Sequence, residues 1–540
     1  MATLVLYNGP IYTLDLGQPV VRAIAIRDGR VFALGSEGRV QAAVAGMRGE
    51  TLNLRGRAVV PGLTDAHVHL PWQGLATYEA RLGTATTLDA ALAIIADRAR
   101  ALPSGVWLRG GGWNHVDWGR RWPTRTDLDA VCPDRPAILT RKDGHSYWVN
   151  SPTLALAGIS ADTPDPAGGQ IQRDRDGVPT GILFEAAMDL VRAVVPPIGE
   201  AERLAALRVA LHDALSYGIT SLHIPPGTNH ADGPETLRDL QTLRAGGELP
   251  VRSLVFLAQP DLERALALGL RSGVGDRWLR IGGLKLFADG SLGSESAEML
   301  SHYEGRRHMG IATIEQAELE RLVRQANAGG ISVAVHAIGD AANRKVLDAI
   351  ELAQADRRQA GEGYPALAMP NRIEHVQVIH PKDLPRLAQL GVIASMQPLH
   401  ATSDMDMADA LWGARSAYAY AWGSLKESGA TLAFGSDAPV ESMNPWRGLH
   451  AAVTRQRPSG YPEGGWYPEQ RLSVDEALRA YCLGPAIASG EDREKGYLAP
   501  GMLADLVVLT GDPFRNAPAD LPAITAAMTF VEGKLAFERA

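Results

Sequence analysis

The sequence predicts an α/β protein built on a (β/α)8 barrel. Eight short apolar runs with strand character alternate with segments of helical spacing, which is the pattern of a parallel barrel. Both ends of the chain are rich in strands but lack that alternation. One stretch, residues 71–200, interrupts the rhythm between the first and second runs. These observations predict a barrel, a small β-sandwich domain built from both termini, and an insertion after the first barrel strand.

The size and charge of the chain narrow the classes of function. At 540 residues it exceeds the roughly 100 to 200 residues of one ordinary domain. A net charge of -8 and a pI near 6.0 give no basic excess for nucleic acid or an anionic membrane. Two cysteines are too few for a disulfide framework, and no leader or long apolar run is visible. We expect a soluble cytoplasmic protein with a small-molecule substrate, and homo-oligomerisation is left open.

The two ends of the chain are expected to pair with each other. Residues 1–58 and 487–540 both contain short strands separated by turn residues. The turn pairs are Asn8-Gly9, Asp28-Gly29, Arg55-Gly56 and Glu532-Gly533. Because neither piece alone buries much core, they should form one composite β-sandwich, an all-β unit. The barrel domain then comprises residues 59–70 and 201–486.

Eight runs are the candidate barrel strands. They are AVVPGLTDAHVH at 58–69, ITSLHI at 219–224, VRSLVFL at 251–257, GGLKLFADG at 282–290, SVAVHAIGD at 332–340, NRIEHVQV at 371–378, VIASMQP at 392–398 and TLAFGSDAPV at 431–440. The clearest helix follows the fourth run: it is predicted to begin with a capping box of Thr313 and Gln316 and to stop at Gly329-Gly330. In such a barrel, catalytic residues lie at the C-terminal ends of the strands.

Polar residues end or interrupt the apolar runs at these positions. His67 and His69 are one residue apart, so on a strand both imidazoles share a face, with Asp65 beside them as a supporting carboxylate. The whole set is His67, His69, Lys285, His336, His375 and Asp437. Four imidazoles, a carboxylate and a lysine suit zinc or a similar divalent ion.

Each of these residues also has a structural interpretation. His336 and His375 could be core histidines, Lys285 could pair with Asp289, and Asp437 could cap a turn. Separate accidents would have to place all of them at strand ends. One shared metal site explains the whole set.

The chain resembles the amidohydrolase superfamily and, within it, the amidohydrolase 3 or YtcJ-like branch. The resemblance covers nearly the whole chain through PGLTDAHVHL, GWNHVDWG, PTRTDLDAV, RKDGHSYWVNSPTLALAGI, GGLKLFADGSLGS, AVHAIGD, RIEHVQ, GSDAPV and LAPGMLADLVVL. It implies a TIM barrel that binds one or two divalent ions, most simply zinc. It also implies that His67, His69, Lys285 as its carbamate, His336 and His375 are metal ligands, with Asp437 facing the metal as the acid/base residue.

Residues 71–200 are interpreted as an inserted domain that covers the active site. Six tryptophans lie here, and such a cluster is either core or a platform over the site: Trp72, Trp107, Trp113, Trp118, Trp122 and Trp148. The resemblance implies that the DGH motif faces the active site, so His145 is the candidate donor to a substrate carbonyl. A hydrogen bond within the insertion is the alternative role of His145. Residues 401–422 are a candidate second flap.

One departure from the resemblance concerns the loop after the second run. Relatives commonly have a polar residue followed by Asp, whereas this chain has His223-Ile224-Pro225-Pro226. We expect this loop to contact the substrate, so the substrate of a relative should not be transferred.

The residues predict a metal-dependent hydrolase of carbon–nitrogen bonds, most simply non-peptide amides. In this mechanism a metal-activated hydroxide attacks a carbonyl, while Asp437 takes a proton and returns it to the leaving amine. Hydrolysis of a lactone or ester on the same site is the first alternative. A non-catalytic binding or regulatory barrel is the second, although such a protein would have no need of Asp437 beside the ligands.

Overall fold

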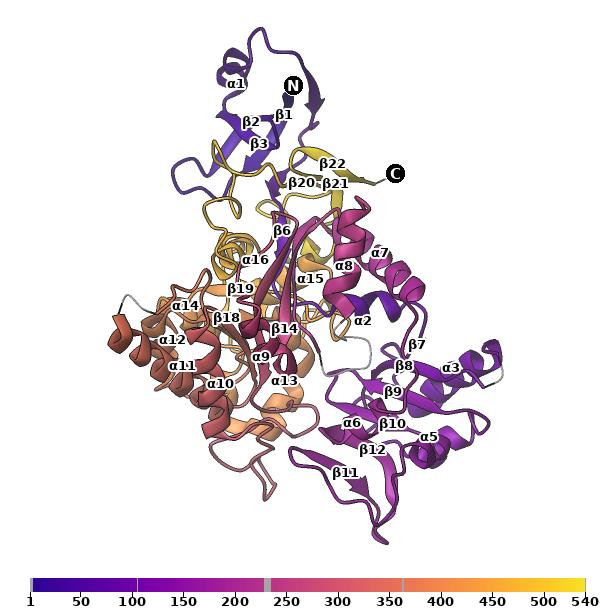
Figure 1. Cartoon of the computed structure of the whole chain (residues 1–540). Coiled ribbons are helices and arrows are strands. Elements are labelled where there is room, and N and C mark those ends of the chain that lie inside the picture. The colour runs from indigo at the N-terminus through magenta and orange to yellow at the C-terminus, as the bar shows by residue number, and fades with distance from the viewer. Residues whose placement is uncertain (1–2, 104, 228–234, 362–363, 540) are drawn as a thin grey trace.

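The computed structural model describes residues 3–103, 105–227, 235–361 and 364–539, which fold around three β-sheets (Figure 1). One sheet is the barrel, one joins both ends of the chain, and one belongs to the segment between the first two barrel strands. The predicted fold class is therefore confirmed.

The central sheet contains all eight predicted barrel strands, paired in parallel in chain order. Its strands are β6 (Leu63–Asp65), β13 (Ile219–Ile224), β14 (Arg252–Ala258), β15 (Leu279–Phe287), β16 (Val333–Ala337), β17 (Arg372–His375), β18 (Ile393–Met396) and β19 (Leu432–Phe434). The first and last strands approach each other, because Ala66 N donates to Phe434 O at 3.1 Å and Asp437 N to His67 O at 2.7 Å. These bonds close the barrel beside the predicted site.

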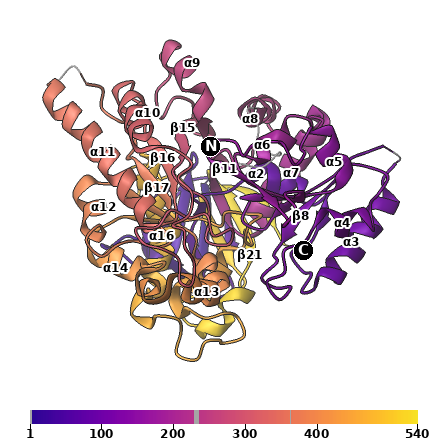
Figure 2. The same ribbon diagram turned by 90° about the horizontal axis from the view of Figure 1, so that it is seen from below.

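Helices surround the barrel on its outer side, as the view from below shows (Figure 2). They are α7 (Glu200–Ser216), α8 (Glu235–Ala245), α9 (Leu262–Ala267), α10 (Gln316–Ala328), α11 (Asp340–Ala360), α12 (Leu384–Leu390), α13 (Pro398–Trp412), α14 (Trp422–Glu427), α15 (Pro445–Thr454) and α16 (Val474–Ala488). Short 3-10 helices are η1 (Gln259–Asp261), η3 (Gly413–Tyr418), η4 (Pro468–Gln470) and η5 (Pro518–Ala523).

The predicted start of α10 is wrong, although its end is confirmed at Gly329. Glu315 is the residue before the helix and makes no side-chain cap. Thr313 instead donates its hydroxyl to Phe287 O at 2.7 Å. Its side chain therefore tethers the connection after β15 to that strand, and no capping box forms.

The second sheet joins both ends of the chain and lies above the barrel in Figure 1. It contains β1 (Thr3–Tyr12), β2 (Val20–Arg27), β3 (Arg30–Gly35), β4 (Gly49–Asn53), β5 (Val59–Pro61), β20 (Leu506–Leu509), β21 (Ala526–Val531) and β22 (Lys534–Glu538). Asp28-Gly29 and Glu532-Gly533 have positive φ and turn the two hairpins, as predicted. A short helix, α1 (Glu37–Ala43), corrects the expectation of an all-β unit.

Two local expectations differ in this sheet. Asn8-Gly9 falls inside β1, where the pairing with β2 shifts register, so it forms an irregularity and no turn. The run at 58–69 is two strands: β5 pairs with β20 in this sheet, and β6 begins the barrel. Gly62 lies between the two strands. A larger residue would not fit at this position, because a Cβ there would lie 2.2 Å from Thr220 Oγ1.

The segment after β6 forms the third, six-stranded sheet with its own helices. Its strands are β7 (Ala80–Arg81), β8 (Leu108–Trp113), β9 (Ala137–Arg141), β10 (Ser146–Val149), β11 (Gly169–Arg173) and β12 (Pro179–Glu185). Its helices are α3 (Leu88–Ala101), α4 (Arg125–Asp129), α5 (Ser151–Leu156) and α6 (Met188–Arg192), whereas α2 (Leu70–Leu75), directly after β6, packs against α7.

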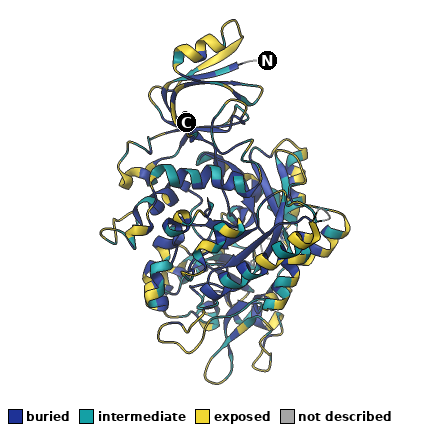
Figure 3. Ribbon diagram, turned by 90° about the vertical axis from the view of Figure 1, so that its left-hand side faces the viewer, coloured by how far each residue is buried: buried dark blue, intermediate teal, exposed yellow. Residues whose placement is uncertain are grey.

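Burial follows this architecture (Figure 3). The largest cluster of buried apolar residues lies between the barrel strands and their helices, and smaller clusters lie within the other two sheets. Within the described ranges, the helices are all too short or too polar to cross a membrane. The polar exceptions to this burial pattern gather at one end of the barrel.

Candidate active site

The ends of the barrel strands bring all six predicted residues to one cavity of about 380 Å³. His67, His69, Lys285, His336, His375 and Asp437 all line it and are all buried. They come from five different strands or the turns that follow them. The predicted residues thus converge, as the geometry of a parallel barrel requires.

Asp437 lies against the two histidines of the His-x-His pair. Its Oδ1 is 3.1 Å from His69 Nε2 and 3.5 Å from His67 Nε2. The histidines follow β6 and do not lie within it, so strand alternation was not the reason for their convergence. The turn instead brings the rings to a centroid distance of 5.3 Å. The predicted pairing is right, and its predicted geometric cause is wrong.

Three histidines are oriented by a hydrogen bond from the ring nitrogen that faces away from the cavity. His67 Nδ1 lies 2.5 Å from Glu374 Oε2, and His375 Nδ1 lies 2.9 Å from Gln397 Oε1. His336 uses Nε2 to donate to Gly290 O at 2.8 Å. Each bond fixes the tautomer and leaves the other nitrogen with a lone pair, which is how ligating histidines are held.

Asp65 does not support either imidazole, contrary to the expectation from strand alternation. Its carboxylate accepts from His67 N at 3.2 Å, Ser436 N at 2.9 Å and Ser436 Oγ. It therefore ties the first strand end to the turn that carries Asp437. Burial raises the pKa of Asp65 to about 7.

Lys285 is only 2% exposed and holds its Nζ 4.7 Å from the centroid of the Phe287 ring. Burial lowers the pKa of Lys285 to about 8. Asp289, the alternative partner, accepts backbone N–H groups of Ile338, Gly339 and Glu298 at 2.7 to 3.0 Å. The carboxylate of Asp289 thus fixes neighbouring turns, and pairing with Lys285 is not its role.

The backbone is strained at the residues that form the site. Asp437, His375 and Glu185 have φ values of 60°, 78° and 48°, in the left-handed region. Such conformations cost about 1 to 3 kcal/mol each and persist where surrounding structure enforces them. His375 is the last residue of β17, and its unusual φ allows both Glu374 and His375 to reach the interior, which two adjacent strand residues ordinarily would not do.

These residues fit a divalent metal. Ligand atoms of His67, His69 and Asp437 lie within 4.8 Å of one another, as do those of His375, His400 and Asp437. His67 Nε2 and Asp437 Oδ1 are buried, and within the described ranges neither makes a well-directed hydrogen bond, although His69 Nε2 lies 3.1 Å from Asp437 Oδ1. Burying such atoms without partners is costly, and a cation between them would remove that cost.

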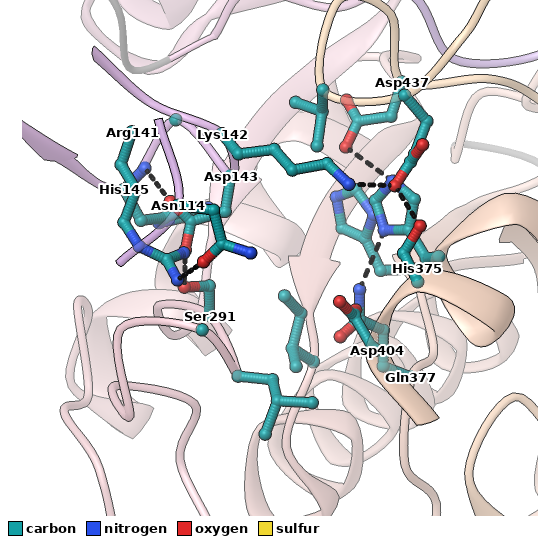
Figure 4. Close-up of a pocket in the computed structure, with 18 of the residues that line it drawn as sticks. Asn114, Arg141, Lys142, Asp143, His145, Ser291, His375, Gln377, Asp404 and Asp437 are labelled. Atoms are coloured by element: carbon teal, nitrogen blue, oxygen red, sulfur yellow. Dashed lines mark hydrogen bonds and ion pairs between the residues drawn. The ribbon is translucent and has the colours of Figure 1, made fainter. Parts of the chain in front are cut away.

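His145 approaches the same cavity from the inserted sheet (Figure 4). Its ring centroid lies 4.8 Å from that of His336, and its Nδ1 lies 2.9 Å from Glu185 Oε2. Burial alone would lower the pKa of His145, but Glu185 and Asp143 raise it to about 9. An imidazolium is therefore placed at the cavity wall. The alternative role, a hydrogen bond within the insertion, also exists and serves to orient the ring.

Ion pairs and hydrogen bonds at the cavity connect the insertion to the barrel. Lys142 pairs with Glu441 at 2.5 Å, and Ser403 Oγ donates to the same carboxylate oxygen at 2.5 Å. Arg141 pairs with Asp143 at 2.6 Å, and Asp143 accepts from Ser291 at 2.5 Å (Figure 4). The insertion thus contributes one wall of the cavity.

The tryptophans of the insertion mostly form its core. Trp113, Trp118 and Trp148 are buried in one apolar cluster with Trp122 at its edge, and Trp107 packs on a second cluster. Trp72 differs, because it lies on α2, lines the cavity, and has its ring centroid 6.1 Å from that of His69.

Residues 401–422 are mainly helical and do not form an open flap. Most belong to α13 and η3, and Asp404 and Met407 on α13 line the cavity. Tyr420 supports this wall by donating to Asp404 at 2.6 Å, while Met405 and Trp412 are core residues.

His223 does not line the cavity. It lies inside the barrel and contacts Arg372, with 3.0 Å between His223 Nδ1 and Arg372 Nη1. Gly227 reaches the cavity, and the rest of that loop, 228–234, lies outside the described residues. In this loop, a contact with the substrate is therefore expected only from residues that follow Pro226.

Sequence reasoning missed the residues that orient the site. They are Glu374, Gln397 and Glu185; Gln377 and the cavity residue His400, which contact each other, were missed as well. The sequence could have indicated Gln397, because Ser395 and Gln397 are polar residues at alternate positions of the apolar seventh run. No comparable pattern marks Glu185, which ends a strand of the inserted sheet.

Substitution of both His67 and His69 by Ala is expected to remove at least one metal equivalent per chain. His67 and His69 are two of the three groups in the cluster that they form with Asp437. Without them, the Asp437 carboxylate alone would hold a divalent ion weakly. Elemental analysis after dialysis measures the result. The control replaces the exposed His302 and His308 by Ala and should keep the parent's metal content. Equal metal in the parent and the His67/His69 variant would show that the ion binds elsewhere.

The sequence model of the amidohydrolase family matches residues 50–537 of this chain. The chain is 35% identical to the protein LONG AFTER FAR-RED 3 of Arabidopsis thaliana, over 99% of this chain and 91% of that protein. It is 34% identical to the putative amidohydrolase YtcJ of Bacillus subtilis, over 99% of each. It is 31% identical to the N-substituted formamide deformylase of Arthrobacter pascens, over 100% of this chain and 99% of that protein.

The fold is shared with solved structures as well. An uncharacterised metal-dependent hydrolase from Pyrococcus horikoshii superposes with a TM-score of 0.75 at 28% identity, covering 96% of this chain and 99% of the other. The similarity therefore extends over the barrel, the terminal sheet and the insertion together.

Proposed function

Because the chain belongs to the amidohydrolase family, we propose that it is a metal-dependent hydrolase of carbon–nitrogen bonds in small non-peptide amides. The observation that carries the proposal is the position of Asp437, whose Oδ1 lies within 3.5 Å of both His67 Nε2 and His69 Nε2. A carboxylate at that place can both contact a divalent ion and move a proton beside it.

The side chains divide the work of hydrolysis between them. A divalent cation, most simply zinc, would polarise the scissile carbonyl and lower the pKa of water when bound to His67, His69, His336, His375, Asp437 and modified Lys285. Asp437 would accept a proton from the attacking water and return it to the leaving nitrogen. His145, held by Glu185, would donate to the carbonyl oxygen from the opposite wall.

An amide substrate is favoured over an ester for two reasons. An amine is a poor leaving group unless it is protonated, and Asp437 is placed for that transfer. The similar N-substituted formamide deformylase acts, by its name, on a formamide C–N bond. Lactone or ester hydrolysis needs the same polarised carbonyl without the second proton transfer.

A mass-spectrometric screen of zinc-loaded protein tests the proposal. The panel contains N-formyl amines, other N-acyl amines, cyclic amides, and lactones or esters of matched size. Turnover of amides with release of the amine supports the proposed function. Turnover of lactones or esters alone would replace it with the ester alternative. No turnover of any class, with metal bound, would favour a binding or regulatory barrel.

The Glu185→Gln variant is expected to move the alkaline limb of kcat/KM to lower pH. With a raised pKa of about 9, His145 is protonated below that pH and loses its proton as the pH rises through it. Removing the Glu185 carboxylate removes the main attraction that holds this proton. The hydrogen-bond donor is then lost at a lower pH.

Rates measured from pH 6 to 10 on one amide from the screen give the two limbs. Glu441→Gln is the matched control, since it removes a cavity carboxylate that pairs with Lys142 and does not contact His145. Coinciding alkaline limbs in the parent and Glu185→Gln would exclude His145 as the titrating donor.

A further inference from the structure

His400 is a buried residue of the cavity that the predicted site does not include. It is the third residue of α13 and only 6% exposed. Its Nε2 lies 3.5 Å from Asp437 Oδ2, whereas His67 and His69 face the other carboxylate oxygen, Oδ1. Within the described part of the chain, this nitrogen has no hydrogen-bond partner closer than that contact.

Two roles are open to an imidazole at this place. With His375 and Asp437 it could ligate a metal, because their ligand atoms lie within 4.8 Å of one another. Alternatively, its Nε2 could carry a hydrogen and donate it. The choice depends on which ring nitrogen is protonated, and the partner at Nδ1 sets that.

The Nδ1 partner of His400 differs from those of the ligating histidines. Nδ1 of His67 faces the carboxylate of Glu374, and Nδ1 of His375 faces the amide oxygen of Gln397. These partners accept hydrogen bonds, so Nδ1 carries the hydrogen in both rings and Nε2 keeps its lone pair for a metal. Both rings therefore have the tautomer of a ligand.

His400 has the opposite arrangement. Its Nδ1 lies 3.1 Å from Gln377 Nε2, an amide nitrogen, which can only donate. With the Gln377 amide in this orientation, Nδ1 of His400 accepts and the neutral ring carries its hydrogen on Nε2. The negative Asp437 Oδ2 on the Nε2 side favours the same tautomer independently of Gln377.

We propose that His400 is a positioning residue that donates its Nε2–H to Asp437 Oδ2. This bond would fix the rotation of the carboxylate and keep Oδ1 turned toward His67 and His69, where the proton has to be taken. The distance of 3.5 Å is long for such a bond, and bonds of this kind commonly shorten when substrate is bound. The inference rests on the proposed function, since it assigns a partner to the residue that moves the proton.

Two substitutions separate a donor from a ligand. His400→Leu removes every polar atom, whereas His400→Gln keeps an amide N–H near the position of Nε2. We expect His400→Leu to keep the parent's zinc content and KM but to lose about 10 to 100-fold in kcat, the usual cost of removing an orienting partner. His400→Gln should recover a large part of that loss. The control is His450→Leu, at a buried histidine of α15 outside the cavity lining.

The outcomes that overturn the proposal are distinct. Loss of a zinc equivalent in His400→Leu would make His400 a ligand, and a change in KM alone would make it a substrate contact. Equal kcat in the parent and His400→Leu would leave it with no role in the reaction. These comparisons are made on an N-formyl amine and on p-nitrophenyl acetate. Turnover of the ester alone would end the amide proposal and still report the effect of His400.

A measurement without substrate completes the test. In zinc-loaded protein labelled with ¹⁵N-histidine, the two-bond ¹⁵N–¹H spectrum reports which ring nitrogen carries the hydrogen, and the His400→Gln variant assigns the signal. Hydrogen on Nε2 of His400 supports the proposal. Hydrogen on Nδ1, or a metal-shifted Nε2, overturns it even in a protein without detectable turnover.

Discussion

Asp437→Asn is expected to keep the fold and the bound metal while turnover falls about 100 to 10,000-fold, the usual range for losing a general acid/base. The Asn side chain has the same shape, and its oxygen can still face His67 and His69, 3.5 and 3.1 Å from Oδ1 in the parent. An amide cannot take up the proton, so only the transfer step is removed. Turnover on the amide from the screen, zinc content and thermal unfolding are measured together.

The matched control for this variant is Asp239→Asn. Asp239 is also a buried carboxylate; it accepts from Arg203 at 2.6 and 3.0 Å and does not line the cavity. This control should lose stability and keep turnover per folded molecule. If Asp437→Asn instead stayed within a few-fold of the parent in turnover, Asp437 would be removed from the mechanism.

The barrel was predictable because its strands are buried on both faces. Such strands appear as short continuous apolar runs, and all eight runs became barrel strands. The pairing of the two chain ends was predictable for a different reason: neither end could bury a core alone. The break between β5 and β6 at Gly62 was not predictable, because it depends on the close approach of Thr220, which is more than 150 residues away in the chain.

The convergence of the candidate ligands was predictable, but the orientation of their side chains was not. Strand ends in a parallel barrel meet at one face, so polar residues placed there converge whatever their separation in sequence. The partner of His67 is Glu374, 307 residues away, and strand alternation would place Glu374 opposite its neighbour His375. The positive φ of His375, the last residue of that strand, breaks the alternation, and no residue type in the sequence predicts that conformation.

Lys285 gives the second large expected effect, and its argument begins with burial. Its ammonium would be costly to desolvate among Leu284, Leu286 and Phe287, and burial lowers its pKa to about 8. Cations beside it would lower the pKa further, so a charged lysine is the wrong group for a metal site. The neutral amine has a lone pair that can attack the carbon of CO₂ and lose a proton, which gives a carbamate.

A carbamate would supply two oxygens at the place where the other strands supply imidazoles. We therefore expect Lys285→Ala to lose one zinc equivalent and most activity, with partial recovery of both on adding acetate or propionate. Lys285→Glu should keep more zinc than Lys285→Ala, because it carries its own carboxylate. The added acids replace the missing oxygens only if the space left by the side chain is open to the cavity, which Lys285 lines.

Lys495→Ala is the matched control, because Lys495 is a second buried lysine, held by Glu491 at 3.0 Å away from the cavity. It should cost stability, keep zinc, and show no response to acetate. The competing interpretation is an unmodified Lys285 beside a single metal ion. It predicts that Lys285→Ala keeps its zinc and that added carboxylates do nothing. A high-resolution map with a bare amine at Lys285 in fully metallated, active protein would falsify the carbamate and leave the histidine ligands standing.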